Sequence, residues 1–194
     1  LNNPFIRVVL EDRFEDTTMI APKDLSFSII PLINSVVRVG TMEEKELLFR
    51  ALNSIDAEET FTVTKRKKNK VTGKFDKYEL VQTFYEYTYD VCQKVKGRQD
   101  ALVKKTMVQL EKDLDNSGGV VIGVLQTSEH GSITGLVANK IASKFQKPAL
   151  LVYHVNGKYV GSGRGYEKVL PSLKDWCNET ELVEFAQGHA NAFG

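Results

Sequence analysis

The sequence of 194 residues lacks several features that would narrow its class at once. It has no apolar run near the roughly 18 residues that a membrane-spanning helix needs, and no stretch resembles a secretory signal peptide. Its formal net charge is only +1, so any attraction for nucleic acid must come from local patches. We therefore expect a cytoplasmic globular protein with no membrane partner. The chain begins with Leu1 rather than Met, which suggests a piece of a longer protein.

Cysteine and histidine are also scarce. Cys92 and Cys177 lie far apart and neither belongs to a Cys-x-x-Cys pair, so we expect two reduced thiols rather than a disulfide or a zinc site. The three histidines, His130, His154 and His189, have no carboxylate partner in a recognisable motif. No phosphate loop of the Gly-x-x-x-x-Gly-Lys type is present, and no residue stands out as a nucleophile.

The first third of the chain has the signals of short helices. Asn3 precedes a proline, which is typical of an N-cap, and Pro22 marks a second helix that Pro31 would end. Thr41 and Glu44 form the capping-box pattern at the start of a third helix, in which the apolar residues share one face.

A basic stretch, TVTKRKKNKVTGK, follows these helices. It has six basic residues between Lys65 and Lys74 and no acidic residue. Val63, Val71 and Gly73 are compatible with a loose hairpin. A solvated loop is the favoured interpretation. The alternative is a patch that tracks a phosphate backbone, formed by Lys65, Arg66, Lys67, Lys68 and Lys70.

An apolar pattern with helical spacing runs from Tyr78 to about Leu114 and predicts a long helix that connects two domains, with Gly97 bending or splitting it. Tyr85 and its neighbours Tyr87 and Tyr89 could stack on bases, but packing in the core is the favoured interpretation.

The second half changes to an α/β pattern. The run VVIGVL (120–125) is typical of a strand covered on both faces, and ALLVYHV (149–155) predicts a second strand. Between them, an apolar stripe from Ile133 to Phe145 predicts a helix. Asn156 and Gly157 are a strong signal for a two-residue hairpin, with KYVGSG as the returning strand. This order predicts a small mixed sheet.

Glycine accompanies polar residues at three places in this half. His130 and Ser132 lie in a loop that leads into a helix, where free backbone N–H groups and the helix dipole suit an anion. Arg164 lies between glycines, and its guanidinium matches the geometry of phosphate. His189 lies among small residues that let a phosphate approach it closely. Each place has a simpler explanation: solvated histidines, an Arg164–Glu167 pair, and ordinary turn glycines. Because all three places lie at the ends of elements in one α/β unit, their side chains are predicted to converge on one phosphate-binding site.

Several stretches, in this order, resemble motifs of the DHH-family phosphoesterases, and among them of the RecJ-like single-strand-specific exonucleases. PLINSVVR resembles the family's Pro-x-Ile-Asn-Ala-x-x-Arg segment, and VKGRQ resembles its Asn-x-x-Arg-Gln stretch. EHGSITGLVA resembles Trp-His-Glu-Gly-Val-Ile-Gly-Ile-Val-Ala. GSGRG and GHANAFG resemble the Gly-Ser-x-Arg-Ser and Gly-Gly-His-x-x-Ala-x-Gly motifs of the DHH-associated domain. The matching residues are Pro31, Ile33, Asn34, Arg38, Arg98, Gln99, His130, Gly135, Val137, Ala138, Ser162, Arg164, Gly188 and His189.

The chain also departs from these motifs. Gln187 replaces the first glycine of Gly-Gly-His, Gly165 replaces the serine after the arginine, and Gly131-Ser132 replaces Glu-Gly. The basic stretch at about 62–77 resembles an insertion. These departures indicate a divergent member, such as one from a phage or prophage.

The resemblance implies an α/β fold, α+β overall. Residues 1–115 would be the last helices of the catalytic domain with the connecting helix, and residues 116–194 the DHH-associated substrate-binding domain. The Asp-His-His motif that binds Mn²⁺ or Mg²⁺ would lie before Leu1. This chain would then hold no catalytic residue and no metal, and would be inactive alone. The implied substrate-binding residues are Asn34, Arg38, His130, Ser132, Ser162, Arg164, Gly188 and His189.

The resemblance further implies that the whole enzyme hydrolyses phosphodiester bonds of single-stranded DNA, and that this chain works with an upstream catalytic domain. Two alternatives remain open at this point. One is a relative that cleaves very short RNA or cyclic dinucleotides, and the other is a non-catalytic nucleic-acid-binding or replication-scaffold protein with the same fold.

Overall fold

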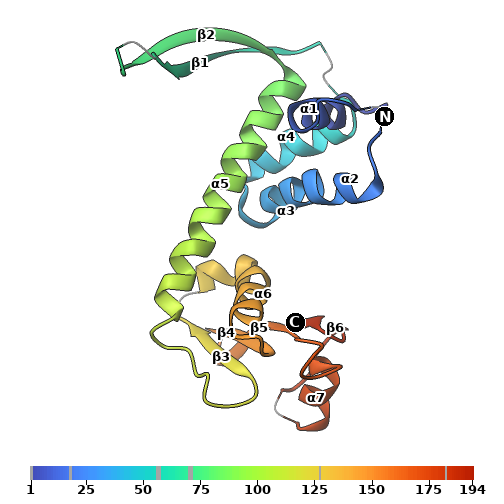
Figure 1. Cartoon of the computed structure of the whole chain (residues 1–194), viewed down its shortest axis with the longest axis vertical. Helices are drawn as coiled ribbons and strands as arrows, with labels where there is room; N and C mark the ends of the chain where they lie inside the picture. The colour runs from blue at the N-terminus through green and yellow to red at the C-terminus, as the bar shows by residue number, and fades with distance from the viewer. Residues whose placement is uncertain (1, 18, 56–57, 70–71, 127, 182) are drawn as a thin grey trace. The chain divides into compact units, whose positions relative to one another are not determined.

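The computed structural model describes residues 2–17, 19–55, 58–69, 72–126, 128–181 and 183–194. The chain folds as two compact units, Leu1–Arg98 and Gln99–Gly194 (Figure 1). Helix α5 (Phe84–Leu110) contributes residues to both. The predicted combination of a helical first part, a long helix and a small mixed sheet is confirmed. The assignment of residues 1–115 and 116–194 to two family domains stays a prediction.

Four helices form most of unit 1: α1 (Pro4–Arg13), α2 (Pro22–Ser28), α3 (Ile30–Val39) and α4 (Met42–Leu52). The predicted N-cap Asn3 accepts a hydrogen bond from the Ile6 amide at 3.0 Å. Its side-chain nitrogen donates to the Leu52 carbonyl at 2.9 Å, so one side chain joins the start of α1 to the end of α4. The helix that begins at Pro22 ends at Ser28, and Pro31 lies in the first turn of α3.

The predicted capping box of α4 is present. The Glu44 amide donates to the Thr41 hydroxyl at 3.3 Å, and the Glu44 carboxylate accepts from the Thr41 amide at 2.8 Å. The same carboxylate accepts two hydrogen bonds from the Arg98 guanidinium on α5, and this contact is the main reason why its pKa lies below the ordinary glutamate value. Glu44 therefore fixes α4 to α5 and caps α4 at the same time.

The core of unit 1 lies between these helices and the first half of α5. Phe5, Val9 and Val36 are fully buried there together with Phe84 of α5. Tyr85 and Tyr89 are buried in this cluster, and Tyr87 stacks on Phe61 with ring centroids 4.1 Å apart. Core packing of the three tyrosines is thereby confirmed over stacking on bases.

The basic stretch forms a regular β-hairpin rather than the favoured loop. Strand β1 (Thr60–Lys68) pairs antiparallel with β2 (Phe75–Thr83) over its full length, and the hairpin extends from the first turn of α5 (Figure 1). The prediction of a helix from Tyr78 was therefore wrong for residues 78–83. Alternating threonines and apolar residues in β1 favour a strand, and Thr83 forms a capping box with Glu86 that starts α5 at Phe84. Lys70 and Val71, which belonged to the predicted patch and hairpin, lie outside the described residues.

Helix α5 is continuous from Phe84 to Leu110, so the predicted split at Gly97 is wrong. Gly97 is exposed, and a Cβ added there would meet no atom within 4 Å. Glycine destabilises a helix through backbone entropy. The helical hydrogen bonds of the neighbouring turns outweigh this cost at Gly97.

Unit 2 contains a five-stranded mixed sheet in the order β3-β4-β5-β7-β6. The strands are β3 (Val121–Leu125), β4 (Ala149–Val155), β5 (Lys158–Arg164), β6 (Gly188–His189) and β7 (Ala192–Phe193). The pair β3 and β4 is parallel and the remaining pairs are antiparallel. The predicted Asn156-Gly157 turn joins β4 to β5, with both residues at positive φ.

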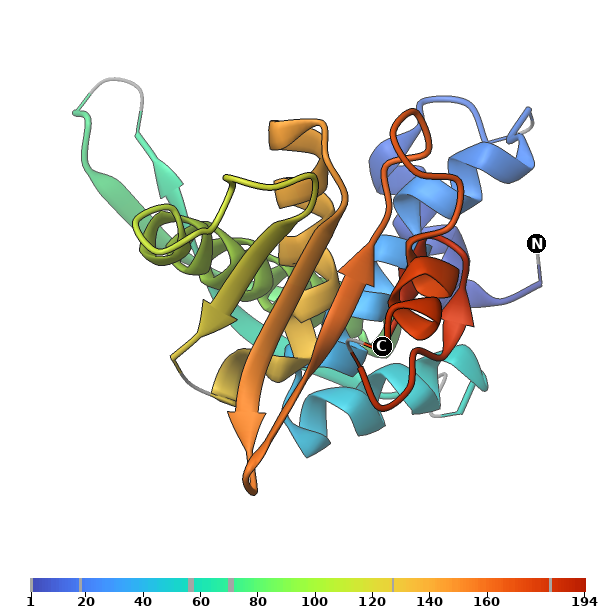
Figure 2. The ribbon, with the colours of Figure 1, turned by 90° about the horizontal axis from the view of Figure 1, so that it is seen from below.

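Two helices cover the sheet. The 3₁₀ helix η1 (Ser128–Ile133) leads into α6 (Thr134–Phe145), whose buried residues pack on one face (Figure 2). Helix α7 (Leu173–Glu179) packs on Phe193 and Leu150 through Leu173 and Cys177. Strand β3 lies at the edge of the sheet. The prediction that both of its faces are covered was wrong: Ile122 and Val124 are 43% and 40% exposed.

Both cysteines are free and buried, which agrees with the prediction of reduced thiols. Burial raises the pKa of the Cys92 thiol to about 12 and also raises the pKa of Cys177. Both thiols are therefore protonated at neutral pH and act as small apolar residues. None of the helices in the described part of the chain is long and apolar enough to span a membrane.

Gly97 and Gly73 give a matched pair for testing the continuity of α5. Neither has an atom within 4 Å of an added Cβ, but only Gly73 has a positive φ, of 69°. We expect Gly97→Ala to raise the free energy of unfolding by about 0.5–1 kcal/mol, because alanine loses less backbone entropy in a helix. Gly73→Ala should lower it. Thermal unfolding followed by circular dichroism measures both, and a loss of stability in Gly97→Ala would contradict an unstrained helix.

Candidate functional site

Arg164 and His189 lie in one row across the sheet of unit 2. In the register of the strands, Arg164 of β5 is paired with Ala192 of β7, and Ala192 is paired with His189 of β6. Directly paired residues of antiparallel strands project from the same face, so Arg164 and His189 face the same side with only a methyl group between them. Two strand spacings place their Cα atoms about 10 Å apart.

Two glycines beside this row leave no space for a side chain. A Cβ on Gly188 would lie 2.7 Å from the Ala192 carbonyl oxygen and 2.9 Å from the Phe193 Cα, and the φ of Gly188 is 135°. A Cβ on Gly163 would collide with the Phe193 ring. Both positions therefore need glycine, which explains the glycine before His189 and the glycine before Arg164.

Asn191 fixes the turn between β6 and β7. Its side-chain amide donates to the Pro171 carbonyl at 2.9 Å, and its backbone carbonyl accepts from the Gly165 amide at 3.0 Å. The side-chain oxygen of Asn191 occupies the space that a Cβ on Gly165 would need. The departure from the family's serine at residue 165 is thus matched by this asparagine, a residue that sequence reasoning did not single out.

The guanidinium of Arg164 lies against the first turn of α6. A Cβ added to Gly135 would collide with Nη2 of Arg164, while Nη1 donates to the Gly163 carbonyl at 2.7 Å. The N-terminus of a helix carries partial positive charge and free N–H groups. The guanidinium and the helix N-terminus both attract an anion that lies between them or beside them.

Hydroxyl groups hold β5 against the start of α6. Thr134 donates to the Gly131 carbonyl at 3.0 Å, and the hydroxyls of Thr134 and Ser162 are 2.9 Å apart. Because the single Thr134 proton is directed to Gly131, Ser162 is the donor in this pair. Tyr153 closes the other side of η1, since a Cβ on Gly131 would lie 2.6 Å from its hydroxyl oxygen. These contacts position Arg164, which shares its face of β5 with Ser162.

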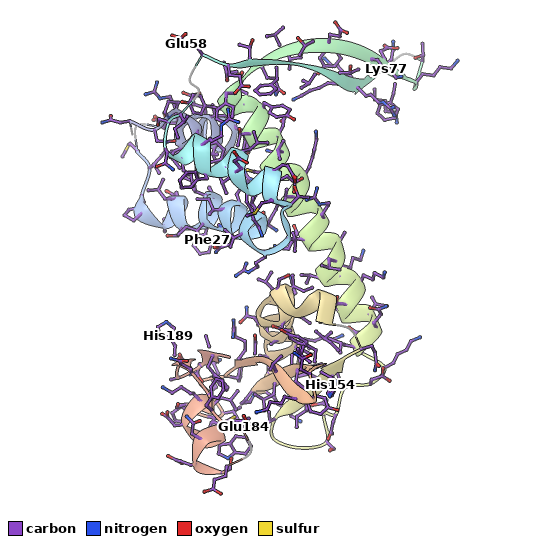
Figure 3. All side chains as sticks on the ribbon, turned by 180° about the vertical axis from the view of Figure 1, so that it is seen from behind. Phe27, Glu58, Lys77, His154, Glu184 and His189 are labelled. Atoms are coloured by element: carbon purple, nitrogen blue, oxygen red, sulfur yellow. The ribbon has the colours of Figure 1, made fainter. Side chains whose placement is uncertain are left out.

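His189 is exposed, and its side chain projects outward from β6 (Figure 3). Ser132 is exposed in η1. The backbone of His130 lies in the same 3₁₀ helix, but its side chain lies outside the described residues. The structure thus brings Arg164, Ser162 and the start of α6 together and places His189 in the same row.

Asn34 and Arg38 lie one turn apart in α3 of unit 1, and both are partly exposed. Their predicted role in substrate binding stays a prediction, as do the roles of the site residues in unit 2. Among the residues that the structure describes, no three His, Cys, Asp or Glu side chains gather where they could hold a metal ion.

The chain is similar to exonucleases in sequence and in fold. It is 32% identical over 181 residues to a protein of Bacillus subtilis (strain 168) named as an SPbeta prophage-derived single-strand DNA-specific exonuclease, YorK, and equally to its counterpart from Bacillus phage SPbeta. This match covers 89% of the chain but only 30% of either relative. No family model matches the chain.

Solved structures of RecJ share the fold. RecJ with Mn²⁺ from Thermus thermophilus matches 98% of the chain and 24% of its own length, with a TM-score of 0.67 and 19% identity. A manganese-bound exonuclease RecJ matches 88% of the chain and 36% of its own length, with a TM-score of 0.56 and 18% identity. The predicted resemblance to RecJ-like proteins is confirmed, and the two sequence relatives are of prophage and phage origin.

Gly188 offers a test of the close strand approach on which the row depends. We expect Gly188→Ala to lower the free energy of unfolding by about 1–3 kcal/mol, since the new Cβ meets backbone atoms and the φ of 135° is strained for alanine. Gly119→Ala is the control, because a Cβ there meets no atom within 4 Å. Denaturant titration of both variants gives the comparison, and equal stabilities would contradict the described strand packing.

Proposed function

We propose that this chain supplies part of the binding surface for single-stranded DNA in a RecJ-like exonuclease. The observation that carries the proposal is the row formed by Arg164, Ala192 and His189, with the Arg164 guanidinium against the first turn of α6. The names of the sequence relatives, which are single-strand DNA-specific exonucleases, support the choice of ligand.

The row suits a phosphate backbone for electrostatic and steric reasons. Arg164 stays charged at any relevant pH and can donate two parallel hydrogen bonds to a phosphate. The positive end of α6 adds to its attraction. Ala192 and Gly188 leave little bulk around His189, so a sugar-phosphate chain can approach the sheet closely. His189 then contacts a second phosphate oxygen or the neighbouring phosphate of the strand.

In the proposed whole protein, hydrolysis with Mn²⁺ or Mg²⁺ belongs to a part outside this chain. RecJ structures hold these ions, and the described residues here assemble no comparable ligand set. Asn34 and Arg38 of α3 are proposed to contact the same strand in the whole protein. The contribution of this chain is therefore binding and orientation of the substrate, with no catalytic residue of its own.

Removal of the Arg164 and His189 side chains tests the proposed binding of single-stranded DNA. We expect Arg164→Ala and His189→Ala each to weaken binding of a labelled single-stranded oligonucleotide by about ten- to a hundred-fold, the range for a lost charge-assisted hydrogen bond. Fluorescence anisotropy at fixed salt measures the affinity.

Lys158→Ala is the matched control for these variants. Lys158 begins the same strand and pairs with Glu184 at 2.8 Å, so its removal also costs one positive charge in β5. We expect its affinity to stay within about twofold of the unmodified chain, because exposed charges contribute little at a distance. Equal losses of affinity in all three variants would mean that only the net charge matters. Tighter binding of dinucleotides than of longer strands would favour the alternative of a relative that cleaves very short RNA or cyclic dinucleotides.

A second test concerns catalysis. We expect this chain alone to leave labelled single-stranded DNA intact in the presence of Mn²⁺ or Mg²⁺. Denaturing gel electrophoresis after prolonged incubation detects any shortening. Metal-dependent digestion that follows the purified chain through successive columns would overturn the proposed division of labour.

A further inference from the structure

The β1–β2 hairpin of unit 1 has two faces of different character. Side chains alternate between the faces along each strand, and directly paired residues share a face. The inner face contacts α5, where Phe61 stacks on Tyr87 and Lys65 forms an ion pair with Asp90 at 2.7 Å. The alternate residues of β1 are exposed on the outer face, which points away from α5. The basic residues of this stretch are therefore divided between two faces.

Cations predominate on the outer face. Arg66 of β1 is paired directly with Lys77 of β2, and Lys68 follows two residues after Arg66 on the same face. All three side chains are exposed, and none forms an ion pair with a carboxylate in the described part of the chain. Among the paired residues of this face, the one acidic side chain is Glu79, which lies opposite Thr64. Three positive charges thus stand against one negative charge.

The stability of the hairpin does not explain this face. Like charges on directly opposite residues, such as Arg66 and Lys77, destabilise a strand pair. Lysine on an exposed strand also prevents pairing with other strands, which is the simpler explanation of the charge. That explanation does not account for Phe75, which is paired with Lys68 on the same face and is 65% exposed. Cations beside an exposed aromatic ring indicate a ligand that is anionic and also has a flat apolar part.

A single strand of nucleic acid has both of these groups. Its phosphates are anionic, and its unpaired bases stack on aromatic side chains. Residues two apart along a strand are separated by about 6.8 Å, so Arg66 and Lys68 can contact different phosphates of one extended strand. The major groove of duplex DNA also admits a two-stranded ribbon. The bases of a duplex are already stacked on one another, however, and leave no free base for Phe75.

We infer that the outer face of the hairpin, formed by Arg66, Lys68, Phe75 and Lys77, binds single-stranded DNA, with phosphates on the three cations and one base stacked on Phe75. The choice of DNA as the ligand rests on the proposed function. Lys77 lies near the free end of the hairpin (Figure 3). All four residues belong to unit 1, so this surface is distinct from the Arg164–His189 row of unit 2.

The salt dependence of oligonucleotide binding tests the three cations. Each lost phosphate contact to a single strand should reduce the slope of log affinity against log salt concentration by about 0.7. We expect this reduction in Arg66→Ala, Lys68→Ala and Lys77→Ala, measured by fluorescence anisotropy with a labelled single strand. Lys67→Ala is the matched control, because Lys67 lies between two of these cations in β1 but on the inner face. An equal reduction in Lys67→Ala would overturn the assignment to the outer face.

Substitutions of Phe75 test the stacked base. Phe75→Leu keeps an apolar side chain but removes the ring, and we expect it to weaken binding of the single strand by about five- to 150-fold, the range for one stacked base. Phe75→Trp should retain the affinity, because indole also stacks on bases. Thermal unfolding of both variants shows whether the fold is retained. A loss of affinity for matched duplex DNA in Phe75→Leu as large as that for the single strand would overturn the assignment to unpaired bases.

Combination with Arg164→Ala separates the hairpin from the proposed function. In this background we expect Arg66→Ala to reduce the salt slope by the same amount as in the unmodified chain. Unchanged slopes in all three cation variants, with affinity still lost in Arg164→Ala, would overturn the hairpin surface and leave the proposed function intact. Reduced slopes in these variants, with full affinity in Arg164→Ala and His189→Ala, would support the hairpin surface and overturn the proposed role of the row.

Discussion

The pairing of the short strand β7 between β5 and β6 is the constraint on which the candidate site depends. Only when the register places Ala192 opposite both Arg164 and His189 do these two side chains share a row. That register requires the Phe193 ring to lie over Gly163 and the backbone of Gly188 to follow β7 closely. The glycines near the arginine and the histidine are therefore explained by strand packing before any ligand is considered.

The electrostatics of the row follow from the helix that covers the sheet. Helix α6 begins where Gly135 leaves room for the Arg164 guanidinium, and Ser162 and Thr134 hold strand and helix together. This arrangement places a fixed cation beside the positive end of a helix dipole. Both groups attract an anion, so the site is suited to an anionic ligand.

Local signals in the sequence predicted much of the fold. The Asn156-Gly157 turn, the Asn3 cap and the Thr41–Glu44 capping box act within a few residues, and each is present. The missed start of α5 also had a local signal, because Thr83 and Glu86 form the same type of capping box. Apolar spacing alone suggested a helix from Tyr78, but β-strand pairing with β1 determines the structure there.

The remaining features depend on partners distant in the sequence. The exposure of Ile122 and Val124 follows from the edge position of β3, which a run of apolar residues does not reveal. The contact of Arg164 with Gly135 and the brace formed by Asn191 arise from tertiary packing. The Gln82–Asp90–Lys65 cluster likewise appears only once the hairpin lies against α5.

The most direct measurement of the central claim is a titration of the ¹⁵N-labelled chain with a short single-stranded oligonucleotide, followed by backbone amide chemical shifts. We expect the largest shifts in unit 2 at Gly135, Arg164 and His189, and much smaller shifts with matched duplex DNA at the same concentration. Saturating single-stranded DNA that leaves these three amides unshifted would contradict the account.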